Sequence, residues 1–388
     1  MSVLDKKYRD NDLSVANTSK LKIWCDEDRH NLFEYFTDFN EWIDGDEGLE
    51  LRLRYGIEGL TSPCKALFAS DVEAYNQAFK VFHENQMSLV LSEDYIKDLC
   101  GDNHWFERNQ ERFEQLVNCL LEDVVVPFVG AGLSVESGFP TWKDHLKQQA
   151  RTAGIDPAVT ALLLQEGRYE EVIDDIEIIR NTDVFIQEVR DVFSKTGKVT
   201  DITLRLTELF TDTIITTNYD HVIEQAYDTG VKNRIQVIGS FDILEDPNEE
   251  EITIIKLHGN VKTPARCILS KQQYDAAYGN GTIDLSKPIP KLLSYYYRTS
   301  SLLFLGCSLN LDRTMQVFQA VKNGLGDLDR PQHFSLESMP ESEEQLLERN
   351  AYLLSFGITP IWFPKNNYDY IEQILRCARN ELRYRGKL

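Results

Sequence analysis

The chain has 388 residues, of which 42% are hydrophobic, and a formal net charge of −22. This length accommodates one large domain with a smaller one, or two moderate domains, and either arrangement has enough apolar side chains for a core. The strong negative charge argues against a broad electrostatic grip on nucleic acid or anionic lipid, because their phosphates would be repelled. We therefore expect neither direct nucleic-acid binding nor a membrane contact.

The cysteines and the apolar segments bear on the cellular compartment. The seven cysteines are odd in number and scattered, and no two of them form a C-x-x-C pair. That pattern is typical of reduced thiols in the cytosol rather than of a disulfide framework or a zinc site. The first residues, "MSVLDKKYRDNDLSVANTSKL", lack the apolar core of a signal peptide, and no apolar run is long enough to cross a bilayer. We expect a cytoplasmic protein without a bound metal.

Residues 1–121 are predicted to form an N-terminal, mainly helical module. Three stretches of this acidic, aromatic-rich part have the apolar spacing of helices, namely "DEDRHNLFEYFTDFNEWI", "DVEAYNQAFKVFHENQ" and "HWFERNQERFEQLVNCLLED". The module contains no motif that indicates chemistry. We interpret it as a packing module that serves oligomerisation or regulation.

Residues 122–388 have a different pattern, in which short β-branched runs alternate with helical stretches. The runs are "VVVPFV", "TDTIITT", "IQVIG", "ITIIKL", "SLLFLG", "QHFSL" and "ITPIW". The helical stretches include "TWKDHLKQQA", a long section from Asp156 to Thr196, "DHVIEQAYDTG" and "DRTMQVFQAVKNG". This alternation predicts a Rossmann-like α/β domain, with a mostly parallel sheet, helices on both of its faces and a helical insertion. Ligands of such sheets bind at the carboxyl ends of the strands, where four stretches of interest lie.

Two of these four stretches are rich in small residues. "GAGLS", at 130–134, follows the first strand, and "GCSLNLD", at 306–312, follows "SLLFL". Glycines let a backbone turn sharply and let a phosphate approach the amide groups, and a helix beginning near Pro140 or Thr141 would add its positive N-terminal end. A tight turn without a ligand is the alternative. A dehydrogenase fingerprint is disfavoured, since it needs a glycine at position 135, where the chain has valine.

The other two stretches carry polar side chains at strand ends. "TTNYD", at 216–220, follows "TDTII", and "KLHGN", at 256–260, follows "ITII". Considered alone, Asn218 and Asp220 are residues that cap a helix, and His258 is a packed or solvent-facing histidine. The alternative is that all three side chains face one cleft at the edge of the sheet.

The order and spacing of the four stretches resemble those of one family, the sirtuins. The shared series is GAG-x-S, G-x-P, T-x-N-x-D, HG and G-x-S, and it extends from Val124 to the C-terminus. The resemblance is closest to the zinc-less bacterial branch whose opening motif ends in Pro-Thr-Trp, as residues 140–142 do here, and "QHFSL" and "GITPIWFP" are also similar to that branch. It implies a pocket for NAD, whose diphosphate and nicotinamide ribose the small residues would enclose.

Two departures distinguish the chain from the sirtuin deacylases. Those enzymes carry a zinc module of two C-x-x-C pairs after the catalytic histidine, whereas only Cys267 lies between His258 and Gly306. Their motif continues Pro-Asp-Phe-Arg, where this chain has Pro-Thr-Trp-Lys. The resemblance therefore implies an NAD hydrolase of bacterial anti-phage defence, as in HerA-associated or Thoeris-type systems. The alternatives are an NAD-dependent deacylase or ADP-ribosyl transferase, and a non-catalytic sensor of NAD or ADP-ribose.

The resemblance also implies roles for individual residues. Asn218 would orient a water molecule and the nicotinamide ribose, and Asp220 would hold the carboxamide or the ring. His258 would be the general base, acting on the ribose hydroxyl or on the water. Trp142 would close off the nicotinamide pocket, the alternative being a tryptophan packed in the core. Gly306 and Ser308 would lie on the adenosine side. The residues expected to bind NAD are Gly130, Ala131, Gly132, Ser134, Pro140, Trp142, Thr217, Gly306, Cys307 and Ser308, and no metal site is expected.

An enzyme that destroys cellular NAD has to be controlled. We expect residues 1–121 or a partner to supply that control, through homo-oligomer contacts or occlusion of the site. Similar sirtuin-like proteins act beside a HerA-type ATPase or another defence-system protein. This chain carries no P-loop of its own, so any such ATPase would be a separate protein.

Overall fold

The computed structural model describes residues 33–101, 103–230, 235–239, 251–263, 266–325 and 330–388. The chain divides into two compact units. One unit is Glu111–Leu375, and the other joins Met1–Gln110 to Arg376–Leu388. Sequence analysis expects the change of domain after residue 121, whereas this division falls earlier, within helix α8 (His104–Leu121).

The unit that contains the N-terminal residues is helical where it is described. Its helices before α8 are α3 (Thr37–Asp44), α4 (Leu49–Tyr55), α5 (Pro63–Ser70), α6 (Val72–Val90) and α7 (Glu93–Cys100), with a short 3₁₀ turn at Asp46–Gly48. Two of the three expected helical stretches form α6 and α8, and the third forms α3, although its residues 26–32 lie outside the described part.

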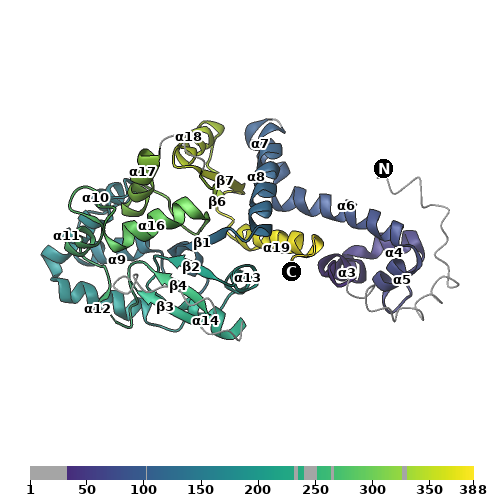
Figure 1. Cartoon of the computed structure of the whole chain (residues 1–388), viewed down its shortest axis with the longest axis horizontal. Coiled ribbons are helices and arrows are strands. Elements are labelled where there is room, and N and C mark those ends of the chain that lie inside the picture. Colours follow the sequence, from purple (N-terminus) through teal and green to yellow (C-terminus); the bar gives the residue numbers. More distant parts are fainter. Residues whose placement is uncertain (1–32, 102, 231–234, 240–250, 264–265, 326–329) are drawn as a thin grey trace. The chain divides into compact units, whose positions relative to one another are not determined.

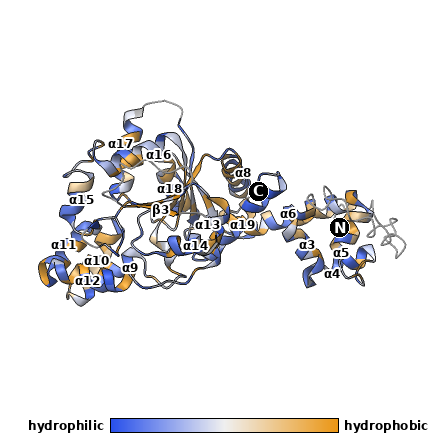
Figure 2. Cartoon of the chain, turned by 60° about the horizontal axis from the view of Figure 1, so that its bottom comes forward, coloured by the Kyte–Doolittle hydropathy of each residue, from blue (hydrophilic) through white to orange (hydrophobic). Residues whose placement is uncertain are grey.

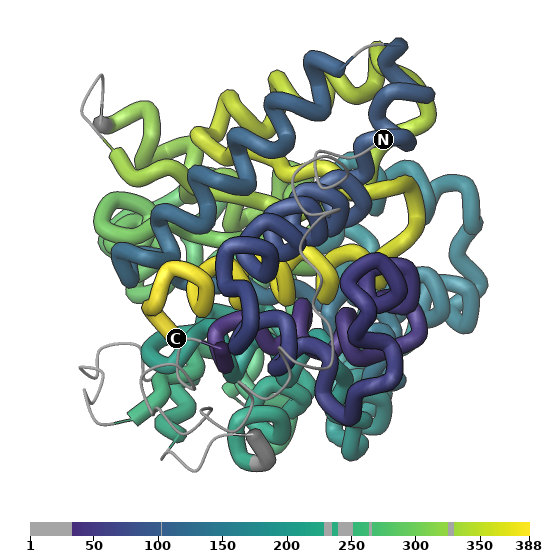
Figure 3. Tube along the Cα trace, turned by 90° about the vertical axis from the view of Figure 1, so that its right-hand side faces the viewer, coloured from purple at the N-terminus to yellow at the C-terminus, as the bar shows by residue number. Residues whose placement is uncertain are grey.

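The core of this unit is aromatic, and the end of the chain contributes to it. Phe39 and Tyr75 are fully buried, with their rings 5.1 Å apart. The last turns of α19 (Asp369–Tyr384) belong to the same unit (yellow in Figure 3), where the Tyr384 ring stacks on Phe36 at 5.4 Å. Arg379 donates a hydrogen bond to an Asp38 carboxylate oxygen at 3.3 Å. The unit is therefore assembled from both ends of the chain.

The other unit contains a seven-stranded sheet in which every pair of neighbouring strands is parallel (Figure 1). The strands are β1 (Val125–Val129), β2 (Thr213–Thr216), β3 (Ile235–Gly239), β4 (Ile252–Lys256), β5 (Ser301–Leu305), β6 (His333–Ser338) and β7 (Ile358–Phe363). All seven expected runs form strands, because their β-branched and aromatic side chains suit a sheet that is buried on both faces. Every residue of β2, β4, β5 and β7 is buried.

Helices cover both faces of this sheet, as expected (Figure 2). The helices that sequence analysis identified are α9 (Trp142–Thr152), the insertion α10 (Pro157–Gln165), α11 (Tyr169–Arg180) and α12 (Thr182–Phe193), then α14 (Val222–Gly230) and α17 (Arg313–Leu325). Five further helices were not singled out, namely α13 (Asp201–Leu209), α15 (Lys271–Tyr278), α16 (Pro288–Thr299), α18 (Glu343–Ser355) and α19, whose first turns belong to this unit. No helix in the described ranges is long and apolar enough to cross a membrane.

The order of the strands determines where a ligand can bind. The sheet has the order β3-β4-β2-β1-β5-β6-β7, so the chain moves to one side of β1 for β2, β3 and β4 and to the other side for the last three strands. The order reverses between β1 and β5, and ligands of open parallel sheets bind at such a switch point, outside the carboxyl ends of the strands. The loops after β1 and β5 are the two small-residue stretches.

Candidate active site

The loops after β1 and β5 meet backbone to backbone. The Gly130 amide donates a hydrogen bond to the Leu305 carbonyl at 2.8 Å, and the Gly132 amide donates one to the Gly306 carbonyl at 2.9 Å. A Cβ atom at Gly130 or Gly132 would lie 2.6 or 2.8 Å from the Gly306 oxygen. A Cβ at Gly306, whose φ is +65°, would lie 2.5 Å from the Leu133 nitrogen. These three glycines are therefore required by the packing of the two loops, in addition to any contact with a ligand.

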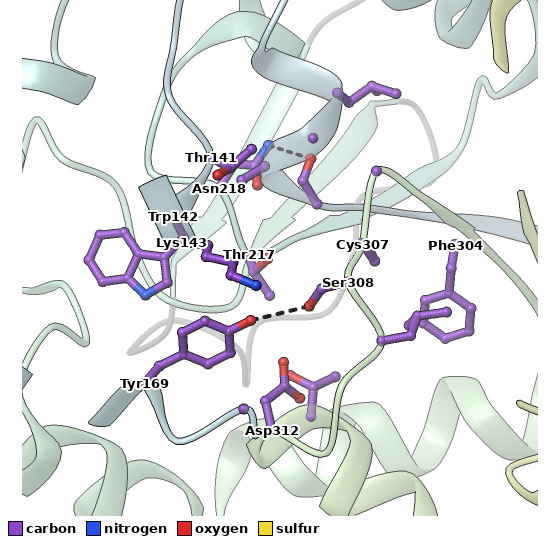
Figure 4. A pocket seen from close by; sticks show the side chains of 18 of the residues that line it. Thr141, Trp142, Lys143, Tyr169, Thr217, Asn218, Phe304, Cys307, Ser308 and Asp312 are labelled. Atoms are coloured by element: carbon purple, nitrogen blue, oxygen red, sulfur yellow. Dashed lines mark hydrogen bonds between the residues drawn. The ribbon is translucent and has the colours of Figure 1, made fainter. Parts of the chain in front are cut away.

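A cavity of about 1290 Å³ opens above these loops (Figure 4). This volume is above the range of about 300–1,000 Å³ that is ordinary for ligand pockets, and it is sufficient for a dinucleotide. The cavity contains twelve of the thirteen expected site residues, namely Gly130, Ala131, Gly132, Pro140, Trp142, Thr217, Asn218, Asp220, His258, Gly306, Cys307 and Ser308. Ser134 does not line it and instead lies behind Asn218. The four chain stretches thus converge on one site.

Asn218 is held so that one of its amide atoms is left for a ligand. Its Nδ2 donates to the Gly130 carbonyl and to the Ser134 hydroxyl, each at 3.1 Å. The side chain is buried, and among the described residues its Oδ1 has no hydrogen-bond partner. A buried acceptor without a partner is costly unless a ligand or water supplies one. The interpretation of Asn218 as a helix cap is wrong, because its amide bonds to the β1 loop instead.

Asp220 does cap the helix that follows, and a buried lysine fixes its segment. An Asp220 carboxylate oxygen accepts a hydrogen bond from the Val222 amide at the start of α14, at 3.0 Å. Lys256, which is 1% exposed, donates to the main-chain carbonyl of Asp220 and lies 2.8 Å from a Glu224 carboxylate oxygen. Burial raises the pKa of Asp220, and the Lys256 charge opposes that rise. Lys256 therefore connects the end of β4 to the segment that carries Asn218.

The imidazole of His258 lies among aromatic side chains. Its Nε2 is 2.9 Å from the Tyr278 hydroxyl and its Nδ1 is 3.5 Å from the Tyr274 hydroxyl. Tyr219 lies on another side, with its ring 6.3 Å from the imidazole and 5.2 Å from the ring of Trp142. Burial lowers the pKa of His258 to about 4, so the imidazole is neutral at physiological pH. A neutral imidazole can accept a proton, as a general base must.

Sequence analysis did not identify several residues of the cavity wall. Asp312 forms the N-cap of α17, accepting from the Met315 amide at 3.0 Å, and burial raises its pKa to about 6. The Tyr169 hydroxyl, at the start of α11, lies 3.5 Å from the Ser308 hydroxyl (Figure 4). Tyr274 could have been found from its spacing to Tyr278, one helical turn apart in "KQQYDAAY". Tyr169 has no comparable signal, because nothing in the sequence brings the helical insertion to the pocket.

The loop after β5 is also fixed from the side of β6. Arg349 on α18 donates hydrogen bonds to the Ser308 carbonyl at 3.0 Å and to a Glu337 carboxylate oxygen at 3.0 Å. Cys307 in the same loop points its thiol at the Phe128 carbonyl, 3.5 Å away, and burial raises the pKa of that thiol. The Cys307 thiol is therefore a packing group rather than a nucleophile.

The described residues offer no group of three or more histidine, cysteine, aspartate or glutamate side chains that could hold a metal ion. The residues that line the cavity carry amide, hydroxyl, carboxylate and imidazole groups, and also the basic side chains of Lys143, Arg168, Lys271 and Arg313. These groups suit a nucleotide and acid–base chemistry.

Comparison with known proteins supports the family indicated by the motifs. Residues 212–361 match the family described as the SIR2-like domain, a range that runs from β2 into β7 and includes Asn218 and His258. The chain is 26% identical over 266 residues to the NAD(+) hydrolase ThsA of Cytobacillus dafuensis, covering 68% of this chain and 49% of that protein. It is 25% identical over 281 residues to the NAD(+) hydrolase ThsA of Bacillus cereus (strain MSX-D12), covering 68% of this chain and 56% of the relative. The chain thus spans about half the length of the curated relatives that it matches.

The family match and the geometry agree on the same residues. The matched range supplies the ends of β2, β4 and β5, and the β1 loop interlocks with the last of these. Residues 212–361 thus match the SIR2-like domain, and the chain is similar over about two thirds of its length to sirtuin-like NAD(+) hydrolases.

Proposed function

We propose that this protein hydrolyses the bond between nicotinamide and ribose in NAD and releases nicotinamide and ADP-ribose. The observation that carries the proposal is the state of Asn218. Its amide nitrogen is committed to Gly130 and Ser134, which leaves a buried Oδ1 acceptor without a partner beside the dinucleotide-sized cavity. That acceptor would hold the attacking water and the nicotinamide ribose.

The reaction suits the groups that are present. Nicotinamide is cationic while it is attached to ribose, so it leaves without the general acid that ordinary glycoside hydrolysis requires. The protein then has to hold an oxocarbenium-like ribose, exclude bulk solvent and admit one water. In the proposal His258 accepts the proton of that water, Asp220 faces the carboxamide, and the loops after β1 and β5 contact the diphosphate and the adenosine. A neutral His258 with a pKa of about 4 is available for this role over the physiological range.

The curated relatives support the same assignment, since they are named as NAD(+) hydrolases. We further propose that the chain acts in the bacterial cytoplasm as an effector of anti-phage defence by depletion of NAD. Control would come from homo-oligomer contacts, from the helical residues 1–121, or from a HerA-type ATPase or other defence-system protein. Such control explains how a cell could tolerate an enzyme that consumes its NAD.

The test is to incubate the purified chain with NAD, with and without acylated peptides, and to follow nicotinamide and ADP-ribose by chromatography. We expect both products to form without peptide. Release that depends on peptide would instead identify a deacylase or ADP-ribosyl transferase. Stabilisation by NAD without any turnover would identify a sensor and overturn the proposal.

Two variants test the roles of the site residues. Asn218→Ala and His258→Ala should each lower nicotinamide release by about two decades or more, the effect of removing a positioned acid–base or orienting group. His104→Ala is a matched control, because His104 is an exposed histidine at the start of α8 that does not line the cavity. Full turnover by a folded His258→Ala variant would refute the assignment of the base.

A further inference from the structure

Asp312 is a half-buried carboxylate of the cavity wall that forms no ion pair with any described residue. It ends the loop after β5 and caps α17, where its donors in the described part of the chain are main-chain amides, that of Met315 at 3.0 Å. The neighbouring Arg313 is committed elsewhere, because its guanidinium lies 2.6 Å from a Glu170 and 2.5 Å from an Asp275 carboxylate oxygen. Burial raises the pKa of Asp312 to about 6, so the group is mainly ionised at pH 7.5.

Two other carboxylates that line the cavity are each paired with an arginine. Glu170 contacts Arg313, and Glu337 lies 3.0 Å from the Arg349 guanidinium. A carboxylate that loses its water without gaining a partner is costly, and a ligand that fills the cavity would remove water from Asp312. The ligand itself therefore has to offer hydrogen-bond donors to Asp312.

The groups at this wall fit a sugar diol and disfavour a phosphate. The Tyr169 and Ser308 hydroxyls, 3.5 Å apart, lie on the same side of the cavity as Asp312 (Figure 4). A carboxylate accepts hydrogen bonds and has none to give, so it suits two neighbouring hydroxyls of a ribose. In dinucleotide-binding sheets an acidic side chain holds the ribose of NAD, whereas an arginine accommodates the 2′-phosphate of NADP. A phosphate beside Asp312 would face a like charge that no cation compensates.

The strand order indicates which ribose of NAD reaches Asp312. In the proposed function the nicotinamide ribose lies at Asn218 and His258, which follow β2 and β4, whereas Asp312 follows β5. Neighbouring strands are about 4.8 Å apart, so the loop after β5 begins roughly 10 Å from the end of β2, with the β1 loop between them. Figure 4 shows Asn218 and Asp312 on opposite sides of the cavity with Ser308 between them. A dinucleotide with its nicotinamide at Asn218 would therefore present its adenosine ribose to Asp312.

We propose that Asp312 makes the site selective for NAD over NADP, an inference that rests on the proposed NAD hydrolysis. The Asp312 carboxylate accepts hydrogen bonds from the 2′- and 3′-hydroxyls of the adenosine ribose and repels a phosphate at the 2′ position. Because these hydroxyls are remote from the bond that breaks, Asp312 determines specificity and takes no part in the chemical step. Glu337 cannot replace it, since Arg349 compensates the Glu337 charge.

Steady-state kinetics of nicotinamide release from NAD and from NADP test the inference. We expect the wild-type kcat/KM to be at least about 100-fold higher for NAD, because like charges in contact are strongly unfavourable. Asp312→Asn keeps a capping side chain and removes the charge, so it should narrow that ratio by about tenfold or more, with the kcat for NAD changed less than about threefold. Asp156→Asn is the matched control and should keep the wild-type ratio, because Asp156 caps α10 through the Ala158 amide at 2.7 Å and does not line the cavity.

Two kinetic results would overturn the inference and leave the proposed function in place. One is a wild-type enzyme that hydrolyses NAD and NADP with similar kcat/KM. The other is an unchanged ratio in an Asp312→Asn variant that circular dichroism shows to be folded, because the discrimination then comes from other residues.

A binding measurement on the wild-type chain separates a failure of this inference from a failure of the proposed function. Isothermal titration calorimetry with ADP-ribose and with ADP-ribose 2′-phosphate needs neither catalysis nor a variant. We expect ADP-ribose to bind at least about 30-fold more tightly. Equal dissociation constants, or binding of neither compound, would overturn the selectivity. Selective binding by a chain that releases no nicotinamide would overturn only the proposed hydrolysis.

Discussion

Replacing the buried lysine at the end of β4 should destabilise the α/β unit by a predictable amount. In Lys256→Met the methionine fills a similar volume, but the Glu224 carboxylate loses the ammonium group 2.8 Å away, and the Tyr219 and Asp220 carbonyls lose their donor. Burial raises the pKa of Glu224, yet the Lys256 charge and the hydrogen bonds from His221 and Lys256 outweigh it and lower that pKa from 4.5 to about 2.

That lowering gives the magnitude of the effect. At about 1.4 kcal/mol for each tenfold change in proton affinity, it corresponds to about 3 kcal/mol. Leaving one partner of a buried pair uncompensated costs about 3–5 kcal/mol in other proteins, which agrees. A carboxylate whose pKa is lowered by folding contributes its stabilisation above its unfolded pKa, so the deficit of Lys256→Met should be complete at pH 7.5. It should shrink as the pH falls below about 4.5.

The assay is thermal unfolding followed by circular dichroism at pH 7.5. A loss of about 3 kcal/mol predicts a midpoint lower by roughly 6–12 °C, at roughly 2–4 °C per kcal/mol for a domain of this size. Glu224→Gln in the Lys256→Met background should restore much of the loss, because the orphaned charge is removed. A loss below about 1 kcal/mol in Lys256→Met, or an unchanged loss in the double variant, would refute the reasoning.

Three further predictions concern the cavity. Asp312→Asn keeps a capping side chain but removes a carboxylate whose pKa burial raises to about 6, and wild-type stability is lost as the pH rises through that value. In denaturant titrations the variant should therefore gain about 1–3 kcal/mol of stability relative to wild type between pH 4 and pH 8. An equal difference between variant and wild type at both pH values would contradict this. Gly306→Ala should destabilise the folded protein by at least about 2 kcal/mol, because the added Cβ would lie 2.5 Å from the β1 loop. The control Gly154→Ala, at φ +76° in open space, should cost only about 1–2 kcal/mol, and equal unfolding midpoints of the two variants would argue against the interlocked loops. Arg349→Gln removes the donor to the Ser308 carbonyl, so steady-state kinetics should show a KM for NAD about threefold to tenfold higher with little change in kcat. An unchanged KM would show that the loop after β5 does not contact the ligand.

Local pattern was sufficient for the strands and for the polar residues at their ends. Runs such as "ITII" are apolar and β-branched, and the loops that follow them contain the residues that reach the cavity, so position in the fold followed from the sequence. The placement of Asn218 and His258 on one pocket depends only on β2 and β4 being neighbours, which a parallel sheet makes a natural expectation.

Long-range contacts were beyond the reach of local pattern. Position 132 has to be glycine because the Gly306 backbone, far away in the chain, leaves no room for a side chain there. The spacing of residues within "GAGLS" cannot reveal that contact. Lys256 ends an apolar strand and would ordinarily be read as solvent-facing, yet its partners on the β2–α14 segment bury it. Tyr169 reaches Ser308 only because the helical insertion folds back, which no short motif encodes.

The meeting of the β1 and β5 loops has an evolutionary consequence. Each of these glycines leaves no room for a Cβ atom at its neighbour across the contact, so a substitution at one position cannot be compensated by a substitution at another. The floor of the pocket should therefore tolerate few single substitutions. The surrounding wall, contributed by α11, α15 and α17, is made of side chains that can be exchanged singly. Relatives that prefer different ligands should therefore differ in the side chains of the wall and share the glycine loops of the floor.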